Sequence, residues 1–201
     1  AAFSFLKPSP FAFAEKKANY KTVANTKDFE IFYKELGVQK LFAVDTETTG
    51  LDVFNDKILG ISFSWQEKSG FYIDLTDEKF KKIALKQLKI ILEDKKIAKV
   101  GHHLKFDYKI FKQIDIELQG MSFDTLLAAY LINPSRGLRL EELAFSYLGY
   151  KKLKLIDLLD EPPKKKKEIN IAQIPADKLA WYAAEDADIT FRLYKKLLPL
   201  I

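Results

Sequence analysis

Residues 41–75 read LFAVDTETTGLDVFNDKILGISFSWQEKSGFYIDL, and this stretch decides the fold of the chain. It opens with an apolar run, which predicts a buried strand over Leu41–Asp45. Two further runs, Ile58–Trp65 and Gly70–Leu75, are rich in β-branched and aromatic residues, and turn residues lie between them at 68–70. Three strands that follow one another so closely predict an antiparallel meander.

Helices are predicted for most of the chain that follows the meander. An amphipathic helix over Glu78–Glu93 has an apolar side formed by Phe80, Ile83, Leu88 and Ile91. A short strand, Ile97–Val100, precedes a helix over Leu104–Gln113. Beyond IELQGMSF the rest reads as helical, with helices from the N-cap Asp124 to Leu131, over Leu140–Leu148, and from Pro175 or Ala176 to Leu198. The pattern is that of an α/β fold, a mixed sheet flanked by helices.

Composition limits the kinds of site that the chain can build. Of its 201 residues, 48% are hydrophobic, which suits one domain with a full core. The net charge of +5 favours an anionic partner. The absence of cysteine excludes disulfides and thiolate metal sites, and there are only two histidines. A metal site would therefore rely on carboxylates, which suit Mg²⁺ or Mn²⁺.

The N-terminal segment, residues 1–19, is expected to be a linker or extension that precedes a domain over residues 20–201. Ala12, Phe13 and Ala14 would suit a signal-peptide cleavage site. However, a basic n-region is missing, and Lys7 and two prolines interrupt the apolar stretch. No apolar run in the chain reaches the ~18–20 residues that span a membrane.

Two carboxylates lie at the C-terminal end of the first predicted strand. Asp45 and Glu47 are two residues apart, so they share one face of an extended chain. Two carboxylates this close repel each other unless a cation lies between them. The alternative interpretation of this pair alone is a solvated strand end.

Acidic residues recur in two later segments. Asp107 lies near the start of the helix that follows the fourth predicted strand, where it would also complement the helix dipole. Tyr182 and Asp186 are four residues apart and project from one face of the last helix. Glu185 is also a neighbour of Tyr182, so spacing alone does not exclude it, whereas Asp188 points elsewhere.

Five blocks in this order, VDTETTGLD, LKFDYKIF, FDTLLAAYLINP, LEELAFSYL and YAAEDADIT, resemble the DEDDy class of 3′–5′ exonucleases. The resemblance covers about residues 20–199 and is strongest to the proofreading exonuclease domain of bacterial family A DNA polymerases. It implies a ribonuclease-H-like fold with a mixed central sheet. It also makes Asp45, Glu47, Asp107 and Asp186 the metal-binding carboxylates, with Tyr182 as the tyrosine that distinguishes the class.

The resemblance implies hydrolysis with two divalent metal ions, Mg²⁺ or Mn²⁺. Two such ions ~3.5–4 Å apart clamp the attacking and leaving oxygens of a phosphodiester. Asp45 is the best candidate to bridge both ions. Because a phenol with a pKa of about 10 is a poor base at neutral pH, Tyr182 is expected to position the attacking water. The product is a nucleoside 5′-monophosphate.

Several residues are expected to contact the substrate strand. The resemblance suggests a wedge for Leu51, a backbone contact for Thr48 and an apolar contact for Ile171. His103 stands where the family usually has an amide, and both histidines also suit an ordinary polar turn. Arg136 and Arg139 are candidates for phosphate contacts, whereas Lys164–Lys167 reads first as a solvated loop.

Three functions are compared. The first is a DNA 3′–5′ exonuclease that acts on a single-stranded DNA 3′ end, linked to a polymerase domain after residue 201 and located in the cytoplasm or an organelle. The second is an RNA-trimming exonuclease similar to ribonuclease D. The third is an inactive fold kept as a spacer, which the presence of all four carboxylates and Tyr182 disfavours.

Overall fold

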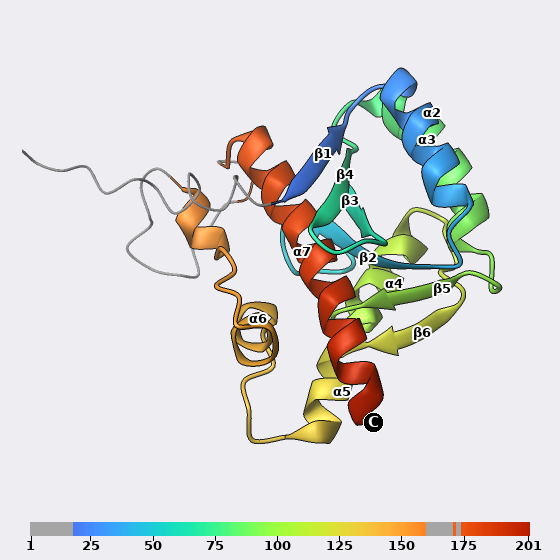
Figure 1. Ribbon diagram of the computed structural model, residues 1–201. Helices are drawn as coiled ribbons and strands as arrows, with labels where there is room; N and C mark the ends of the chain where they lie inside the picture. The colour runs from blue at the N-terminus through green and yellow to red at the C-terminus, as the bar shows by residue number, and fades with distance from the viewer. Residues whose placement is uncertain (1–17, 160–170, 172–173) are drawn as a thin grey trace, which may run out of the picture.

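A six-stranded mixed sheet forms the centre of the fold, with the strand order β1-β4-β3-β2-β5-β6 (Figure 1). The computed structural model describes residues 18–159, 171 and 174–201. The strands β2, β3 and β4 form the predicted antiparallel meander, and parallel strands extend it on both sides. The strands are β1 (Asn19–Val23), β2 (Leu41–Thr48), β3 (Ile58–Ser64), β4 (Ser69–Asp74), β5 (Ala98–Gly101) and β6 (Met121–Asp124).

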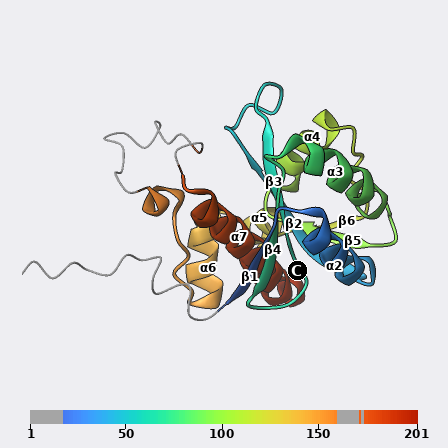
Figure 2. The same ribbon diagram turned by 90° about the horizontal axis from the view of Figure 1, so that it is seen from above.

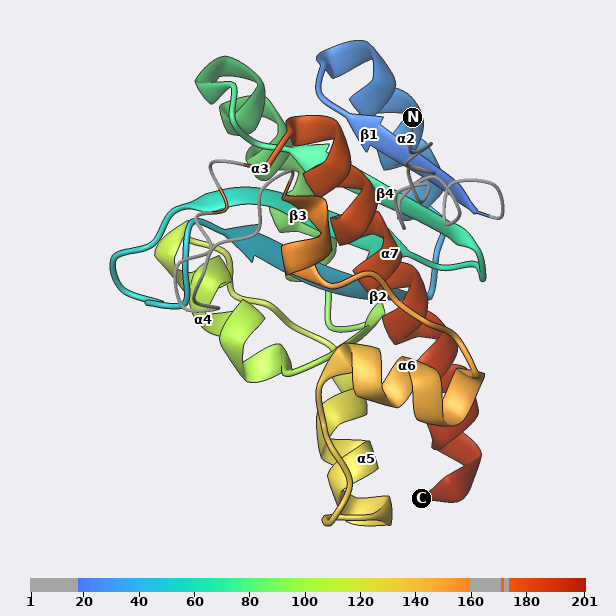
Figure 3. The same cartoon turned by 90° about the vertical axis from the view of Figure 1, so that its left-hand side faces the viewer.

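Helices cover both faces of the sheet. They are α2 (Thr26–Gly37), α3 (Glu78–Leu92), α4 (Leu104–Gln113), α5 (Thr125–Ile132), α6 (Leu140–Leu148) and α7 (Ala176–Leu197), with 3₁₀ turns η2 (Leu155–Leu158) and η5 (Leu198–Leu200). Figure 2 shows α2, α3 and α4 on one side of the sheet and α7 on the other. In Figure 3, α7 crosses in front of β2, β3 and β4, while α5 and α6 lie beside its C-terminal half. Among the described residues, no helix has both the length and the apolar character needed to cross a membrane.

The main hydrophobic core lies between the sheet and the layer of α2, α3 and α4. Phe42 and Val44 of β2 are completely buried in this core, where they join Phe32 of α2. Because side chains alternate along a strand, Asp45 and Glu47 face the opposite side of the sheet. The apolar pattern of β2 thereby directs both carboxylates towards α7.

Small residues allow α7 to lie close to the sheet. Ala180, Ala183 and Ala184 form a buried cluster with Tyr72 of β4. At Gly70, an added Cβ would overlap the backbone carbonyl oxygen of Ala184 and lie 3.1 Å from its carbonyl carbon, so the helix backbone would have to shift. This close contact holds the acidic face of α7 against the carboxylates of β2.

The structure confirms most predicted elements and corrects three points. The strand β2 continues to Thr48, beyond its predicted end at Asp45, so Glu47 also lies within the strand. The sequence analysis assigned no element to IELQGMSF, where the structure has β6, a short strand paired in parallel with β5. Its four residues, two exposed and two half-buried, are too few for a clear apolar alternation. Ile83 is 41% exposed and not part of the core, where Ala84 and Leu92 lie instead.

Two elements, β1 and α2, precede the first predicted strand. They add a parallel edge to the sheet and a helix over its main core. The predicted linker falls almost entirely on residues 1–17, outside the described residues.

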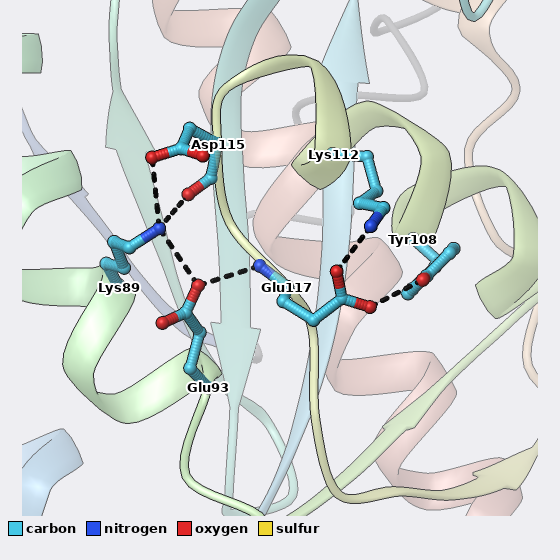
Figure 4. Close-up of polar contacts among 6 residues, drawn as sticks. All are labelled: Lys89, Glu93, Tyr108, Lys112, Asp115 and Glu117. Carbon is cyan, nitrogen blue, oxygen red and sulfur yellow. Dashed lines mark hydrogen bonds and ion pairs between the residues drawn. The ribbon is translucent and has the colours of Figure 1, made fainter.

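A polar network ties α3 to α4 and to the segment that follows α4 (Figure 4). The backbone N–H of Glu117 donates to Glu93 Oε1 (2.8 Å), and Lys89 forms an ion pair with the same oxygen (3.0 Å). The Tyr108 hydroxyl donates to Glu117, which also forms an ion pair with Lys112. Because these groups are partly exposed to solvent, each ion pair contributes only ~0–1 kcal/mol. The network orients α4 without supplying groups to the site described below.

Candidate active site

Three carboxylates from two elements converge on the face of the sheet covered by α7. The oxygens of Asp45 and Glu47 on β2 and of Asp186 on α7 all lie within 4.8 Å of one another. Glu47 and Asp186 are buried, and Asp45 is half-buried. The sequence predicted all three residues, and the packing of α7 on the sheet brings them together.

The neighbouring strand β3 places two small residues beside these carboxylates, and the buried ring of Tyr72 on β4 covers one of them, Gly60. In the register of β2 and β3, Ser62 pairs with Asp45 and Gly60 pairs with Glu47. Both partners are small. The buried Ser62 hydroxyl has no hydrogen-bond partner in the described part of the chain, so it adds an unsatisfied polar atom beside the acids.

Asp107 lies next to the three carboxylates, although it is not one of the set within 4.8 Å. Its Oδ1 accepts hydrogen bonds from the backbone N–H of Thr46 (3.0 Å) and from the Thr46 hydroxyl (2.7 Å). This places the start of α4 against the strand segment between Asp45 and Glu47. Burial raises the pKa of Asp107 to about 7.

Burial and mutual repulsion disfavour the charged forms of the clustered acids. Burial raises the pKa of Asp45 well above its usual range, and the charges of Asp107, Glu47 and Asp186 raise it further. Burial likewise raises the pKa of Glu47 to about 8 and that of Asp186 to about 6. A divalent cation bound between these carboxylates would offset their mutual repulsion, and Mg²⁺ and Mn²⁺ prefer carboxylate oxygens as ligands. The residues present therefore fit Mg²⁺ or Mn²⁺.

Tyr182 lies one helical turn before Asp186, as predicted, and is half-buried against the cluster that contains Trp181. Burial raises the pKa of its phenol above the usual value, and the charge of Asp186 adds to this effect. The hydroxyl therefore stays protonated at neutral pH. It suits the donation of a hydrogen bond better than the removal of a proton.

Two acids close to Asp186 in the sequence, Glu185 and Asp188, have hydrogen-bond partners outside the carboxylate cluster. Glu185 is completely buried and accepts a hydrogen bond from the hydroxyl of Tyr150 (2.6 Å). Asp188 accepts one from the hydroxyl of Tyr20 on β1 (2.8 Å). Both acids therefore support the fold, which resolves the ambiguity that helical spacing left for Glu185.

Sequence reasoning missed Lys152, which enters the site from the segment between α6 and η2. Its ammonium forms an ion pair with Asp186 Oδ1 and lies 3.6 Å from the centroid of the Tyr182 ring. Burial alone would lower the pKa of Lys152, but the charge of Asp186 raises it above the usual value. Its flanking lysines, Lys151 and Lys154, are exposed, so the run KKLK carried no signal that one of them is buried.

The loop between β2 and β3 presents two apolar side chains to solvent. Leu51 is 88% exposed and Phe54 is 85% exposed, so Leu51 is not a core leucine. The sequence analysis did not single out Phe54. The Thr48 hydroxyl donates to the carbonyl of Gly50, which links the end of β2 to this loop.

His103 occupies a left-handed turn (φ 70°) directly before α4. Its backbone N–H and that of Leu104 donate to the two carboxylate oxygens of Asp124 (3.1 and 2.8 Å). Asp124 also accepts a hydrogen bond from the backbone N–H of Leu126 (2.9 Å). The predicted N-cap of α5 is thus confirmed, and the same carboxylate also holds the start of α4.

Two of the remaining predicted substrate contacts, Arg136 and Arg139, line one open groove beside α6. Arg136, Arg139, Lys152 and Lys154 line this groove, which has a volume of about 1060 Å³. Arg136 lies over the ring of Tyr147, and Arg139 forms an ion pair with Glu142. Ile171 is half-buried against the cluster around Trp181. The predicted Lys164–Lys167 contact falls outside the described residues.

Comparisons with known proteins identify the family of the chain. A family model described as a 3′–5′ exonuclease matches residues 20–201. The chain is 31% identical over 193 residues to a DNA polymerase I of Pseudomonas aeruginosa, an alignment that covers 91% of the chain and 21% of that relative. It is 33% identical over 184 residues to a DNA polymerase I of Borreliella burgdorferi, covering 89% of the chain and 19% of that relative.

The chain therefore spans about a fifth of the length of these relatives. The structure of RNase D from Trypanosoma brucei has a TM-score of 0.68 at 16% identity, over 90% of this chain and 65% of that one. This likeness confirms the ribonuclease-H-like fold. With the family match and the convergent carboxylates, these findings show that the chain belongs to the 3′–5′ exonuclease family.

Proposed function

We propose that this domain removes nucleoside 5′-monophosphates from single-stranded or frayed DNA 3′ ends, as the proofreading part of a DNA polymerase. The observation that carries this proposal is the convergence of Asp45, Glu47 and Asp186 within 4.8 Å. Tyr182 one turn before Asp186 completes the arrangement. An inactive spacer would have no need to keep such mutually repelling acids buried.

In this proposal the carboxylates hold two divalent cations. Asp45, Glu47, Asp107 and Asp186 would together hold these ions. When bound, the ions neutralise the charge that develops on the phosphate and on its attacking and leaving oxygens. Thr46 holds Asp107 in place through two hydrogen bonds, so that its carboxylate stays oriented towards the cluster.

Tyr182 positions the attacking water. Its phenol stays protonated because burial raises its pKa. A neutral hydroxyl in this place would donate one directed hydrogen bond to the water and so fix the direction from which the water approaches the phosphorus. One such oriented interaction typically changes a rate by about 100-fold or more.

The proposed strand-binding surface combines apolar and basic side chains. The exposed side chains of Leu51 and Phe54 follow directly after β2, where they would stack on or wedge beside terminal bases. Arg136 and Arg139 line the groove beside α6, where they would attract phosphates. Thr48, His103 and Ile171 remain proposed contacts to the last nucleotides.

Relatives favour DNA over RNA as the substrate. The two curated relatives at 31% and 33% identity are both called DNA polymerase I. We therefore also propose that the domain works within a longer polymerase chain, in the cytoplasm or an organelle. The second candidate, RNA trimming, draws on the likeness to RNase D, whose 16% identity shows the fold alone.

The test compares three substrates that share one sequence and carry a label at the 5′ end: single-stranded DNA, single-stranded RNA and blunt duplex DNA. With Mg²⁺, we expect single-stranded DNA to shorten stepwise from its 3′ end and release 5′-mononucleotides. Duplex should be degraded more slowly, because unpairing an end costs a few kcal/mol. Internal nicking, or RNA degraded much faster than DNA, would contradict the proposal, and Asp45→Asn is the control for contaminating nuclease.

A further inference from the structure

Lys152 occupies a position that metal-dependent hydrolysis does not require. We propose that its ammonium is an internal cation that competes with divalent metal for Asp186, and so sets the metal concentration at which the site fills. This inference rests on the proposed metal-dependent function of the same carboxylates.

The ammonium of Lys152 lies inside the site. The side chain is 2% exposed and forms an ion pair with Asp186 Oδ1. It also donates a hydrogen bond to the backbone carbonyl of Leu153 (3.1 Å) and lies 3.8 Å from Glu185 Oε2. Asp186 Oδ1 is buried, and in the described part of the chain the ammonium of Lys152 is the positive charge in contact with it.

The charge balance makes competition the expected consequence. Asp45, Glu47, Asp107 and Asp186 would carry −4 when ionised, and Lys152 reduces this to −3 (−4 + 1). A metal ion that approaches Asp186 meets a like charge a few ångströms away, whose repulsion is strong in a buried site. The ion must share the carboxylate with Lys152 or displace it.

The local fold allows Lys152 to withdraw. No helix or strand includes residues 149–154, which connect α6 to η2. Lys152 also lines the open groove beside α6, so an ammonium that leaves Asp186 has access to solvent. A displaced Lys152 would then lie where the proposed strand carries its phosphates.

A purely supporting role predicts the opposite effect. If Lys152 only oriented Asp186, its loss would loosen the carboxylate and weaken metal binding, typically by about 10–100-fold. If Lys152 competes, its loss should tighten binding. The sign of the change therefore separates the two roles.

The experiment measures Mn²⁺ binding to the full chain by electron paramagnetic resonance, without substrate. Lys152→Met keeps most of the side-chain volume and removes the charge. Lys151→Met removes the same charge from the exposed neighbouring lysine and is the matched control. We expect Lys152→Met to lower the Kd for Mn²⁺ by about 10-fold or more, because it removes the like charge that the ion meets a few ångströms away. Lys151→Met should leave the Kd unchanged.

An unchanged or higher Kd in Lys152→Met would overturn the inference. If circular dichroism shows that this variant does not fold, Lys152→Gln is measured with the same expected result and the same refuting one. Asp45→Asn, made with Lys152 unchanged, tests the proposed metal site separately from the proposed role of Lys152. If it leaves Mn²⁺ binding intact, the proposed metal site itself is wrong, whatever Lys152 does.

Discussion

Replacing Gly70 with alanine tests whether the close packing of α7 on the sheet builds the site. The added Cβ would lie 3.1 Å from the carbonyl carbon of Ala184 and 3.2 Å from its Cβ. Since the nearest atoms include the helix backbone, no side-chain rotation relieves the overlap, and α7 must move. Overpacking of this kind costs ~1–3 kcal/mol. For a chain of this size that lowers the Tm by about 2–12 °C.

The same movement should lower the exonuclease rate. Ala184 lies two residues before Asp186, so a shift of the helix carries Asp186 and Tyr182 away from β2. A misplacement of ~1 Å typically costs about 100-fold in rate. Calorimetry and single-turnover cleavage of one oligonucleotide at saturating Mg²⁺ measure the two effects.

Gly37→Ala is the matched control, because its added Cβ would lie 4.0 Å from the nearest atom, Ile91 Cδ1. It should leave the rate unchanged and shift stability by no more than ~1 kcal/mol. A Gly70→Ala variant with wild-type Tm and wild-type rate would show that the contact between α7 and the sheet does not position the site.

Four further predictions concern the site and its supports. Tyr182→Phe should still bind metal and should lower the single-turnover rate by about 100-fold or more, since one positioning hydrogen bond is lost. Asp45→Ala should lower both the metal affinity and the cleavage rate, and its rate should be several orders of magnitude below that of Tyr182→Phe. Equal rates for Asp45→Ala and Tyr182→Phe would refute the roles assigned to the two residues. Asp124→Ala removes the N-cap side chain of α5 and the acceptor for two backbone N–H groups at the start of α4. Since each of these two contributions is worth ~0.5–2 kcal/mol, urea unfolding should show a loss of about 1–4 kcal/mol, and no measurable loss would exclude the shared support. Burial raises the pKa of Glu47 to about 8, so the stability that its protonated form contributes is lost as the pH rises through about 8. Without metal, the Tm of Glu47→Gln minus the Tm of the wild type should therefore increase between about pH 6 and pH 9. If thermal melts show that this Tm difference does not change with pH, the raised pKa of Glu47 is contradicted.

Local geometry explains which features were predictable. Asp45 and Glu47 share a face because a strand has a period of two, and Tyr182 and Asp186 share a face because they are four residues apart on a helix. Neither relation depends on the rest of the chain. The bounds of α4 and α6 were also correct, because their apolar spacing and terminal residues lie within the segments themselves.

Features that depend on distant partners were not predictable. Lys152 reads as one of several lysines in a run, and only the path of the segment after α6 places it against Asp186. Glu185 has almost the same spacing to Tyr182 as Asp186 has, and only Tyr150 reveals that it is occupied elsewhere.

The exposure of side chains and the pairing of strands also depended on distant parts of the chain. Phe54 is of a residue type that is usually buried in a core, but the loop between β2 and β3 leaves it 85% exposed. The strand β6 is defined by its pairing with β5, since its four residues are too few for a visible period. The sequence by itself determined the face on which each catalytic side chain lies, because backbone periodicity is local. The tertiary structure alone decided which charges meet there, because the partner of a buried group is whichever residue the fold brings within a few ångströms.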